Sequence, residues 1–175
     1  MYKRQGQCDG STRACSFGTF TFPNVTSVDN KNSSSYGIIA GSQVSYKPPA
    51  GAVGVEYKVH FSLGWLNSSH SIQHFRFYVD NTEITDARFT QANRYHENIV
   101  TFGWYFRIGG SGTDYAIGRF ENWNSTKSFD LRTRAYQTSG NTTARFYATT
   151  YWDGGSSNQF RQPQMEIIAY GNPAV

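Results

Sequence analysis

The feature that most constrains the fold is a strict alternation of apolar and polar residues over positions 53–65. The apolar members, which share one face of an extended chain, are Tyr57, Val59, Phe61, Leu63 and Trp65. The same two-residue period recurs over 72–80 and 99–108. This period is typical of strands with one buried face and does not match the 3.6-residue period of an amphipathic helix.

The rest of the chain repeats this pattern in short pieces. Clusters of Gly, Asn and Pro separate further predicted strands at 15–22, 36–46, 82–84, 127–136, 143–152 and 163–170. Leu, a strong helix former, occurs only three times in 175 residues. We therefore predict an all-β fold, an antiparallel two-sheet sandwich of the jelly-roll type.

The composition suggests one domain preceded by a short leader. Residues 1–14 are polar and glycine-rich, and we expect them to form a polar N-terminal arm. Residues 15–175 carry the strand patterns without an internal repeat or a linker, and we expect them to form a single jelly-roll domain. A chain of this length can bury a sizeable core without disulfide or metal staples.

The net charge of +4 arises from 16 Lys and Arg, most of them Arg, against 12 Asp and Glu. Proteins that bind nucleic acid usually gather their basic residues on one stretch or face. Here the arginines are dispersed through strand-like segments, so we predict solvated or interfacial arginines and no nucleic-acid partner. No apolar run approaches the ~18 residues of a membrane-spanning helix, so we expect no membrane span. No hydrophobic signal region follows Met1, which predicts synthesis without cleavable secretion if Met1 is the native start.

The two cysteines, Cys8 and Cys15, are close in sequence. A local disulfide and two free thiols are both compatible with this spacing. Neither cysteine has the neighbouring ligands that a zinc site needs.

Motifs for catalysis are missing from the sequence. His70 and His74 would share a strand face at a separation too large for easy joint binding of a metal. No spacing among the carboxylates selects a glycosidase pair, and there is no Gly-x-Ser-x-Gly elbow. The glycine-rich stretch 109–112 lacks the Lys of a phosphate-binding loop. We predict no enzyme activity, no metal site and no cofactor.

Several predicted strands carry bulky side chains on both faces, as at Phe77-Tyr78 and Trp104-Tyr105. Only one face of a sandwich sheet packs on the core, so large groups on the other face indicate a further contact surface. The alternative is that Tyr and Arg side chains lie over a solvated surface. We favour oligomerisation.

Three groups of segments carry a resemblance to a known family. The first is VSYKPPAG at 44–51 running into VEYKV at 55–59, and the second is HFRFYVDNTEITDAR at 74–88. The third comprises GR at 118–119, WNSTKS at 123–128, YWDG at 151–154 and IIAYG at 167–171. Together they resemble structural proteins of aquatic bacteriophages, especially cyanophages and other marine phages, and of large algal DNA viruses. Those domains are trimeric jelly rolls of the tumour-necrosis-factor and complement-head type.

The resemblance spans about residues 44–171 and implies a homotrimer on the virion surface. The implied role is a capsid decoration or cement protein, or a head-fibre domain, with the major capsid protein or a fibre shaft as partner. It further implies that strands 127–136 and 165–170 lie in one inner sheet near a threefold axis. The implied trimer-interface residues are Arg132, Arg134, Tyr136, Ile168 and Tyr170.

The alternative function is a carbohydrate- or receptor-binding module at a fibre tip, with a host-surface glycan as ligand. Aromatic rings can stack on a sugar while nearby polar side chains bind its hydroxyl groups. The candidate glycan-facing residues are Trp123, Tyr151, Trp152, Asp153 and Asn158. A jelly-roll lyase or glycosidase is a third alternative, kept only because a fold does not dictate its function.

Overall fold

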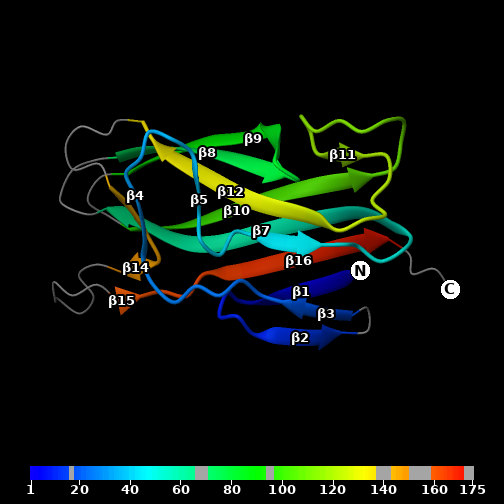
Figure 1. The fold of residues 1–175 in the computed structure, drawn as a ribbon, viewed down its shortest axis with the longest axis horizontal. Coiled ribbons are helices and arrows are strands. Elements are labelled where there is room, and N and C mark those ends of the chain that lie inside the picture. Colours follow the sequence, from blue (N-terminus) through cyan, green and yellow to red (C-terminus); the bar gives the residue numbers. More distant parts are fainter. Residues whose placement is uncertain (16–17, 66–70, 94–96, 137–142, 150–158, 172–175) are drawn as a thin grey trace.

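The computed structural model describes residues 1–15, 18–65, 71–93, 97–136, 143–149 and 159–171. This part of the chain contains no helix, and therefore none long and apolar enough to cross a membrane. Its strands form two main sheets whose inner faces pack together (Figure 1). The predicted all-β, antiparallel two-sheet jelly-roll sandwich is confirmed.

The first layer, here the β7 sheet, contains seven strands within the described residues. They are β1 (Tyr2–Gln7), β4 (Asp29–Lys31), β7 (Ala52–Trp65), β10 (Asn98–Ile108), β11 (Arg119–Phe120), β13 (Ala144–Phe146) and β16 (Gln164–Gly171). The long β7 pairs with β10 along one edge, and with β16 and then β13 along the other. β1 pairs with the far edge of β16, so β16 lies between the first strand and β7.

The second layer, here the β12 sheet, contains five strands within the same residues. They are β5 (Gly37–Ile38), β6 (Val44–Tyr46), β8 (Ser71–Val79), β9 (Thr82–Asn93) and β12 (Lys127–Ala135). β12 pairs with β8 on one side and with β5 and β6 on the other. Two further strand pairs complete the description: β2 (Thr12–Cys15) with β3 (Gly18–Thr21), and β14 (Ala148–Thr149) with β15 (Gln159–Phe160).

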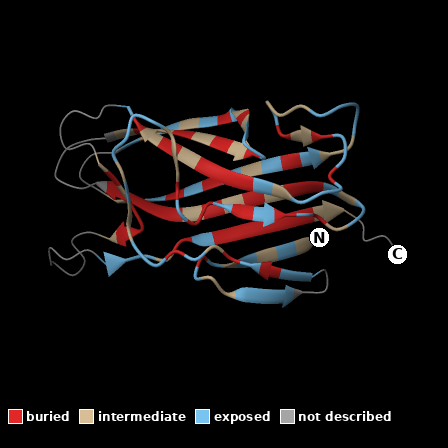
Figure 2. Ribbon diagram, viewed as in Figure 1, coloured by how far each residue is buried: buried red, intermediate tan, exposed pale blue. Residues whose placement is uncertain are grey.

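Aromatic side chains from both layers form the core. The ring of Tyr57 on β7 lies 5.1 Å from that of Phe77 on β8 and 5.8 Å from that of Phe129 on β12, measured between centroids. Buried residues are concentrated in the long strands of the two layers (Figure 2). The alternation over β7 thus has the role that its period predicts, and each buried ring contributes about 1.5–3 kcal/mol of hydrophobic free energy.

The predicted turn at Asp80 and Asn81 joins β8 to β9. Both residues have positive φ, 49° and 62°, as in the two-residue hairpin turns that match the twist of antiparallel strands. The Asp80 carboxylate accepts hydrogen bonds from the Ser128 amide at 2.9 Å and from Lys127 at 3.1 Å. The turn is therefore fastened to β12 as well as to its own hairpin.

The expectation of a polar N-terminal arm over residues 1–14 is wrong. Residues 2–7 form β1, with Tyr2 opposite Ala169 and Gln7 opposite Gln164. Backbone pairing does not need apolar side chains, and an edge strand with one solvated face tolerates a polar sequence. Residues 12–15 likewise form β2, so the first residues belong to the domain.

Candidate functional site

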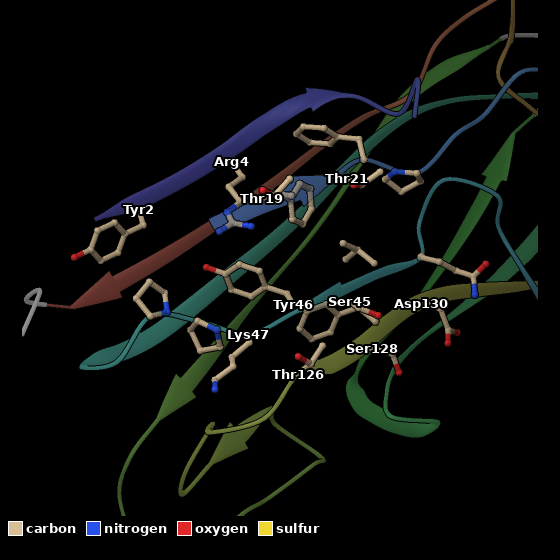
Figure 3. A pocket seen from close by; sticks show the side chains of 18 of the residues that line it. Tyr2, Arg4, Thr19, Thr21, Ser45, Tyr46, Lys47, Thr126, Ser128 and Asp130 are labelled. Carbon is tan, nitrogen blue, oxygen red and sulfur yellow. The ribbon is translucent and has the colours of Figure 1, made fainter. Parts of the chain in front are cut away.

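A groove of about 1200 Å³ opens between β3 and β6 (Figure 3). Residues 19–23 line one wall and residues 43–50 the other, with Tyr2 and Arg4 of β1 between them. β1 is the outer strand of the β7 sheet, and β6 lies at the edge of the β12 sheet. The groove therefore follows the side on which the two layers of the sandwich part.

The β6 wall is an edge strand. Val44 and Tyr46 point into the core, whereas Ser45 is exposed. Ser45 lies opposite Ser128 of β12, and no strand in the described part of the chain pairs with the other edge of β6. The strand ends before Pro48 and Pro49, which lack the amide hydrogen that a sheet ladder requires.

The β3 wall shows the same alternation. Thr19 and Thr21 are exposed, and Phe20 between them is buried with its ring edge-on to Phe22 at 4.9 Å. Phe22 lies against Gly6 of β1, where an added Cβ would come within 2.8 Å of the ring. The absence of a side chain at Gly6 lets this wall lie close to the β7 sheet.

Arg4 places a positive charge between the two walls. Its guanidinium carbon is 5.2 Å from the ring centroid of Phe20 and 5.5 Å from that of Tyr46, within the range of cation–π attraction. The rings belong to opposite walls, so Arg4 bridges them. Figure 3 shows its guanidinium between β1 and Tyr46.

Hydroxyl groups dominate the rim of the groove. The side chains of Thr19, Ser45 and Thr126 are exposed, and their hydroxyls have no hydrogen-bond partner within the described residues. The carboxylate that lines the groove in this part of the chain, Asp130, is bound by both Nε and Nη2 of Arg132. This arrangement can bind a polar ligand by hydrogen bonds from several sides, but it offers no second carboxylate for acid–base catalysis.

The described residues hold no group of three or more His, Cys, Asp and Glu side chains that could bind a metal ion. His60 instead lies 2.9 Å from the Thr101 hydroxyl, and His74 packs beside the ring of Tyr136 at 5.6 Å.

Trp123 does not face a ligand, contrary to our expectation for the glycan-facing loop. It is 4% exposed, and its indole is enclosed by the rings of Phe106, Phe120 and Phe129 at 5.2–5.6 Å. Burying this large apolar ring stabilises the core, so the ring is not available at the surface to bind a ligand. The other residues expected in that loop are Tyr151, Trp152, Asp153 and Asn158, which lie outside the described residues.

The expected trimer-interface residues do not share one surface. Strand β12, with Arg132, Arg134 and the adjacent Tyr136, belongs to one layer, whereas β16, with Ile168 and Tyr170, belongs to the other. The expectation that both strands lie in one sheet is therefore wrong. Ile168 is only 6% exposed within a single chain, although it lies on the outer face of its sheet.

Cys8 is a free thiol buried in the core. Its Sγ lies 3.6 Å from the Gly41 carbonyl oxygen. Burial, helped by the nearby Asp9 charge, raises the pKa of Cys8 to about 12. The side chain of Cys15 lies outside the described residues.

Sequence reasoning missed the groove residues Arg4, Thr19 and Ser45. Arg4 belonged to the supposed arm, and the two hydroxyl residues occupy the solvent positions of alternating strands. The available signal was Lys47-Pro48-Pro49, because a proline pair that ends a short strand favours an edge position.

Comparisons with known proteins give distant similarities only. No protein-family model matches the chain, and no curated protein matches it. Among solved structures, it is similar to the EclA C-terminal domain, a sugar-binding protein, with a TM-score of 0.40 and 13% identity over 70% of this chain and 74% of that one. It is also similar to chains from structures of infectious bursal disease virus. For the Gt strain the TM-score is 0.35 and the identity 10%, over 91% of this chain and 37% of that one. For the Gx strain the TM-score is 0.30 and the identity 12%, over 94% of this chain and 42% of that one.

The chain thus spans less than half the length of the two viral chains. Similarities at this level do not indicate a function.

Proposed function

We propose that this chain is a non-catalytic structural domain of a virion surface that binds a carbohydrate in the groove between β3 and β6. The observation that carries the binding role is the groove itself, about 1200 Å³ in volume, which is lined by Arg4 and by the hydroxyls of Thr19, Ser45 and Thr126, which have no hydrogen-bond partner within the described residues. Carbohydrates present hydroxyl groups on every side of the ring, and a rim of Ser and Thr side chains can donate to and accept from them.

The dimensions of the groove favour an oligosaccharide over a single sugar. Its volume exceeds the range of about 300–1,000 Å³ that is usual for small-ligand sites. The half-buried ring of Tyr2 lies among its lining residues and is a candidate surface for a sugar ring. The exposed Lys47 adds a second positive charge beyond Arg4.

The virion setting rests on the sequence resemblance over residues 44–171 together with the two-sheet sandwich. In that setting the domain decorates or cements a capsid or caps a head fibre, in contact with the major capsid protein or a fibre shaft. A carbohydrate site on such a domain contributes to host attachment.

We further propose that the domain is a homotrimer that assembles through the outer face of the β7 sheet. Ile99 and Tyr105 on that face are 53% and 50% exposed, and Tyr105 packs beside Tyr170. On the same face, Lys3 and Lys58 pair with Glu56 and Glu166. A partly apolar face whose Lys and Glu side chains are paired is suited to contact with its own copy.

Light scattering tests the oligomer. We expect three times the 19.7 kDa of one chain, and a lower mass for Tyr105→Glu. A monomeric mass for the unmodified protein contradicts the trimer.

A glycan array followed by titration calorimetry tests the groove. Ser45→Tyr and Thr19→Tyr place a ring over the groove from opposite walls without disturbing buried residues, and we expect each to abolish binding of the selected glycan. Ser111→Tyr, an exposed position that does not line the groove, is the matched control and should bind normally. Unchanged binding in both groove variants, or no glycan bound by the unmodified protein, overturns the proposal.

A further inference from the structure

Four arginines that are dispersed in the sequence gather on the outer face of the β12 sheet. They are Arg76 of β8, Arg88 of β9, and Arg132 and Arg134 of β12, and we call this set the arginine face. These arginines are therefore dispersed in the sequence but not in the folded domain, so their dispersal does not argue against a basic patch. Strand pairing brings the four side chains together.

The strand register opposes like charges on the arginine face. Arg132 lies directly opposite Arg76. Directly opposed like charges destabilise an antiparallel pair. Arg76 and Arg132 therefore depend on the other groups of this face to hold them opposite one another.

Tyrosine rings hold the guanidinium groups against the sheet. The Arg132 guanidinium carbon lies 3.9 Å from the Tyr78 ring centroid, and that of Arg76 lies 4.3 Å from the Tyr36 ring. Arg134 approaches the same Tyr36 ring at 5.3 Å. The arginines are thus preorganised, and these tyrosine faces are already covered by guanidinium groups.

Carboxylates neutralise only part of this charge. Glu83 forms ion pairs with Arg88 and Arg76, with N–O distances of 2.6 Å and 3.4 Å, and Asp130 forms one with Arg132. Arg134 has no carboxylate partner within the described residues, and its Nε is buried without a hydrogen bond. Four guanidinium groups therefore meet two ion-paired carboxylates in this part of the chain, an excess of two positive charges.

We propose that the arginine face binds a sulfated polysaccharide. A sulfate monoester has three terminal oxygens and can accept hydrogen bonds from two neighbouring guanidinium groups, as the opposed pair Arg76 and Arg132 requires. Single-stranded nucleic acid needs free aromatic faces on which its bases stack. The covered rings of Tyr36 and Tyr78 do not supply them.

The test is the binding of heparin, a sulfated polysaccharide, to the full chain by titration calorimetry at low and moderate salt. We expect salt-sensitive binding that Arg76→Gln/Arg134→Gln weakens by about tenfold or more, since each charge-assisted hydrogen bond lost costs affinity. This double variant leaves both carboxylates paired, because Glu83 keeps Arg88 and Asp130 keeps Arg132. If its thermal unfolding shows a folding defect, Arg134→Gln alone replaces it, with a smaller loss expected.

The matched control is Arg13→Gln/Arg161→Gln, which removes the same charge from exposed positions elsewhere. Two results support the proposal: the control variant binds heparin normally, and the unmodified protein does not bind chemically desulfated heparin. Equal losses in both double variants overturn it, as does stronger binding of single-stranded DNA than of heparin. None of the four arginines lines the groove, so Thr19→Tyr on the β3 wall, away from β12, should bind heparin normally whether or not the groove binds glycans.

Discussion

The hydroxyl of Tyr57 donates a hydrogen bond to the backbone carbonyl oxygen of Ser42 at 2.6 Å, joining the β7 sheet to the segment between β5 and β6. The Ser42 hydroxyl in turn donates to the Ile39 carbonyl oxygen at 2.7 Å and accepts from the Leu131 amide at 3.1 Å. A continuous polar link therefore crosses an otherwise aromatic core. The segment that it anchors leads directly into β6, one wall of the groove.

Tyr57→Phe should destabilise the fold by about 1–3 kcal/mol, because it leaves the Ser42 carbonyl oxygen without its partner in the core. Denaturant unfolding measures this difference. Tyr136→Phe, at an exposed position outside the β7 sheet, is the control and should change stability by less than about 0.5 kcal/mol. Equal stabilities for the two variants would show that the link across the sandwich contributes nothing.

Gly118→Ala should destabilise the protein by about 1–3 kcal/mol through backbone strain and crowding. Gly118 has a φ of +72°, and an added Cβ would lie 2.6 Å from Trp104 Nε1 and 2.9 Å from Phe106. Gly37→Ala is the control, since no atom lies within 4 Å of its added Cβ. A smaller loss of melting temperature for Gly118→Ala than for Gly37→Ala would contradict this account.

Cys8 should resist alkylation in the native protein. Only the thiolate reacts, and with a pKa of about 12 the buried thiol is almost fully protonated at pH 8. Iodoacetamide labelling followed by tryptic mass spectrometry measures the alkylation of each cysteine separately, because cleavage after Arg13 puts Cys8 and Cys15 in different peptides. We expect Cys8 to be labelled only in denaturant. Labelling of the native protein at the rate of a model thiol would be inconsistent with its burial.

Stability should fall as the pH drops below about 5, in part through Glu83. The Arg88 hydrogen bonds, with a contribution from Arg76, lower the pKa of Glu83 below its ordinary 4.5. A depressed carboxyl pKa stabilises the folded state above the unfolded-state value, and this stabilisation is lost as the pH falls through the folded-state pKa.

Glu83→Gln should therefore flatten the acid limb of a plot of melting temperature against pH. Arg88 is exposed and its pairing is screened by solvent, so the change should be small and should shrink further in high salt. The exposed Glu121→Gln is the control. An acid limb equally steep in Glu83→Gln and the unmodified protein would contradict the role of Glu83.

Alternation predicted four of the longer strands because it depends on one local rule, whereas β9 (Thr82–Asn93) was predicted only over 82–84. β7, β8, β10 and β12 have the positions and buried faces that their two-residue period indicates. The turn at Asp80 and Asn81 was equally accessible, since these residue types tolerate positive φ.

Pairing between distant strands could not be predicted from alternation. Nothing in residues 2–7 indicates that their partner is β16, and nothing in Arg76 indicates that it will face Arg132. The groove and the arginine face both depend on such long-range pairing, so their residues came from the fold and not from a motif. Trp123 was wrongly expected at the surface, because the local sequence does not distinguish an aromatic ring in the core from an exposed one.

The position of β16 between β1 and β7 also governs the order of events during synthesis. The first strand cannot dock until residues 164–171 have been made, which at ~5–20 residues per second is a wait of roughly 8–30 s. A waiting apolar strand would be exposed to aggregation on the ribosome. The polar sequence of β1, Tyr-Lys-Arg-Gln-Gly-Gln, keeps it hydrated until its partner arrives.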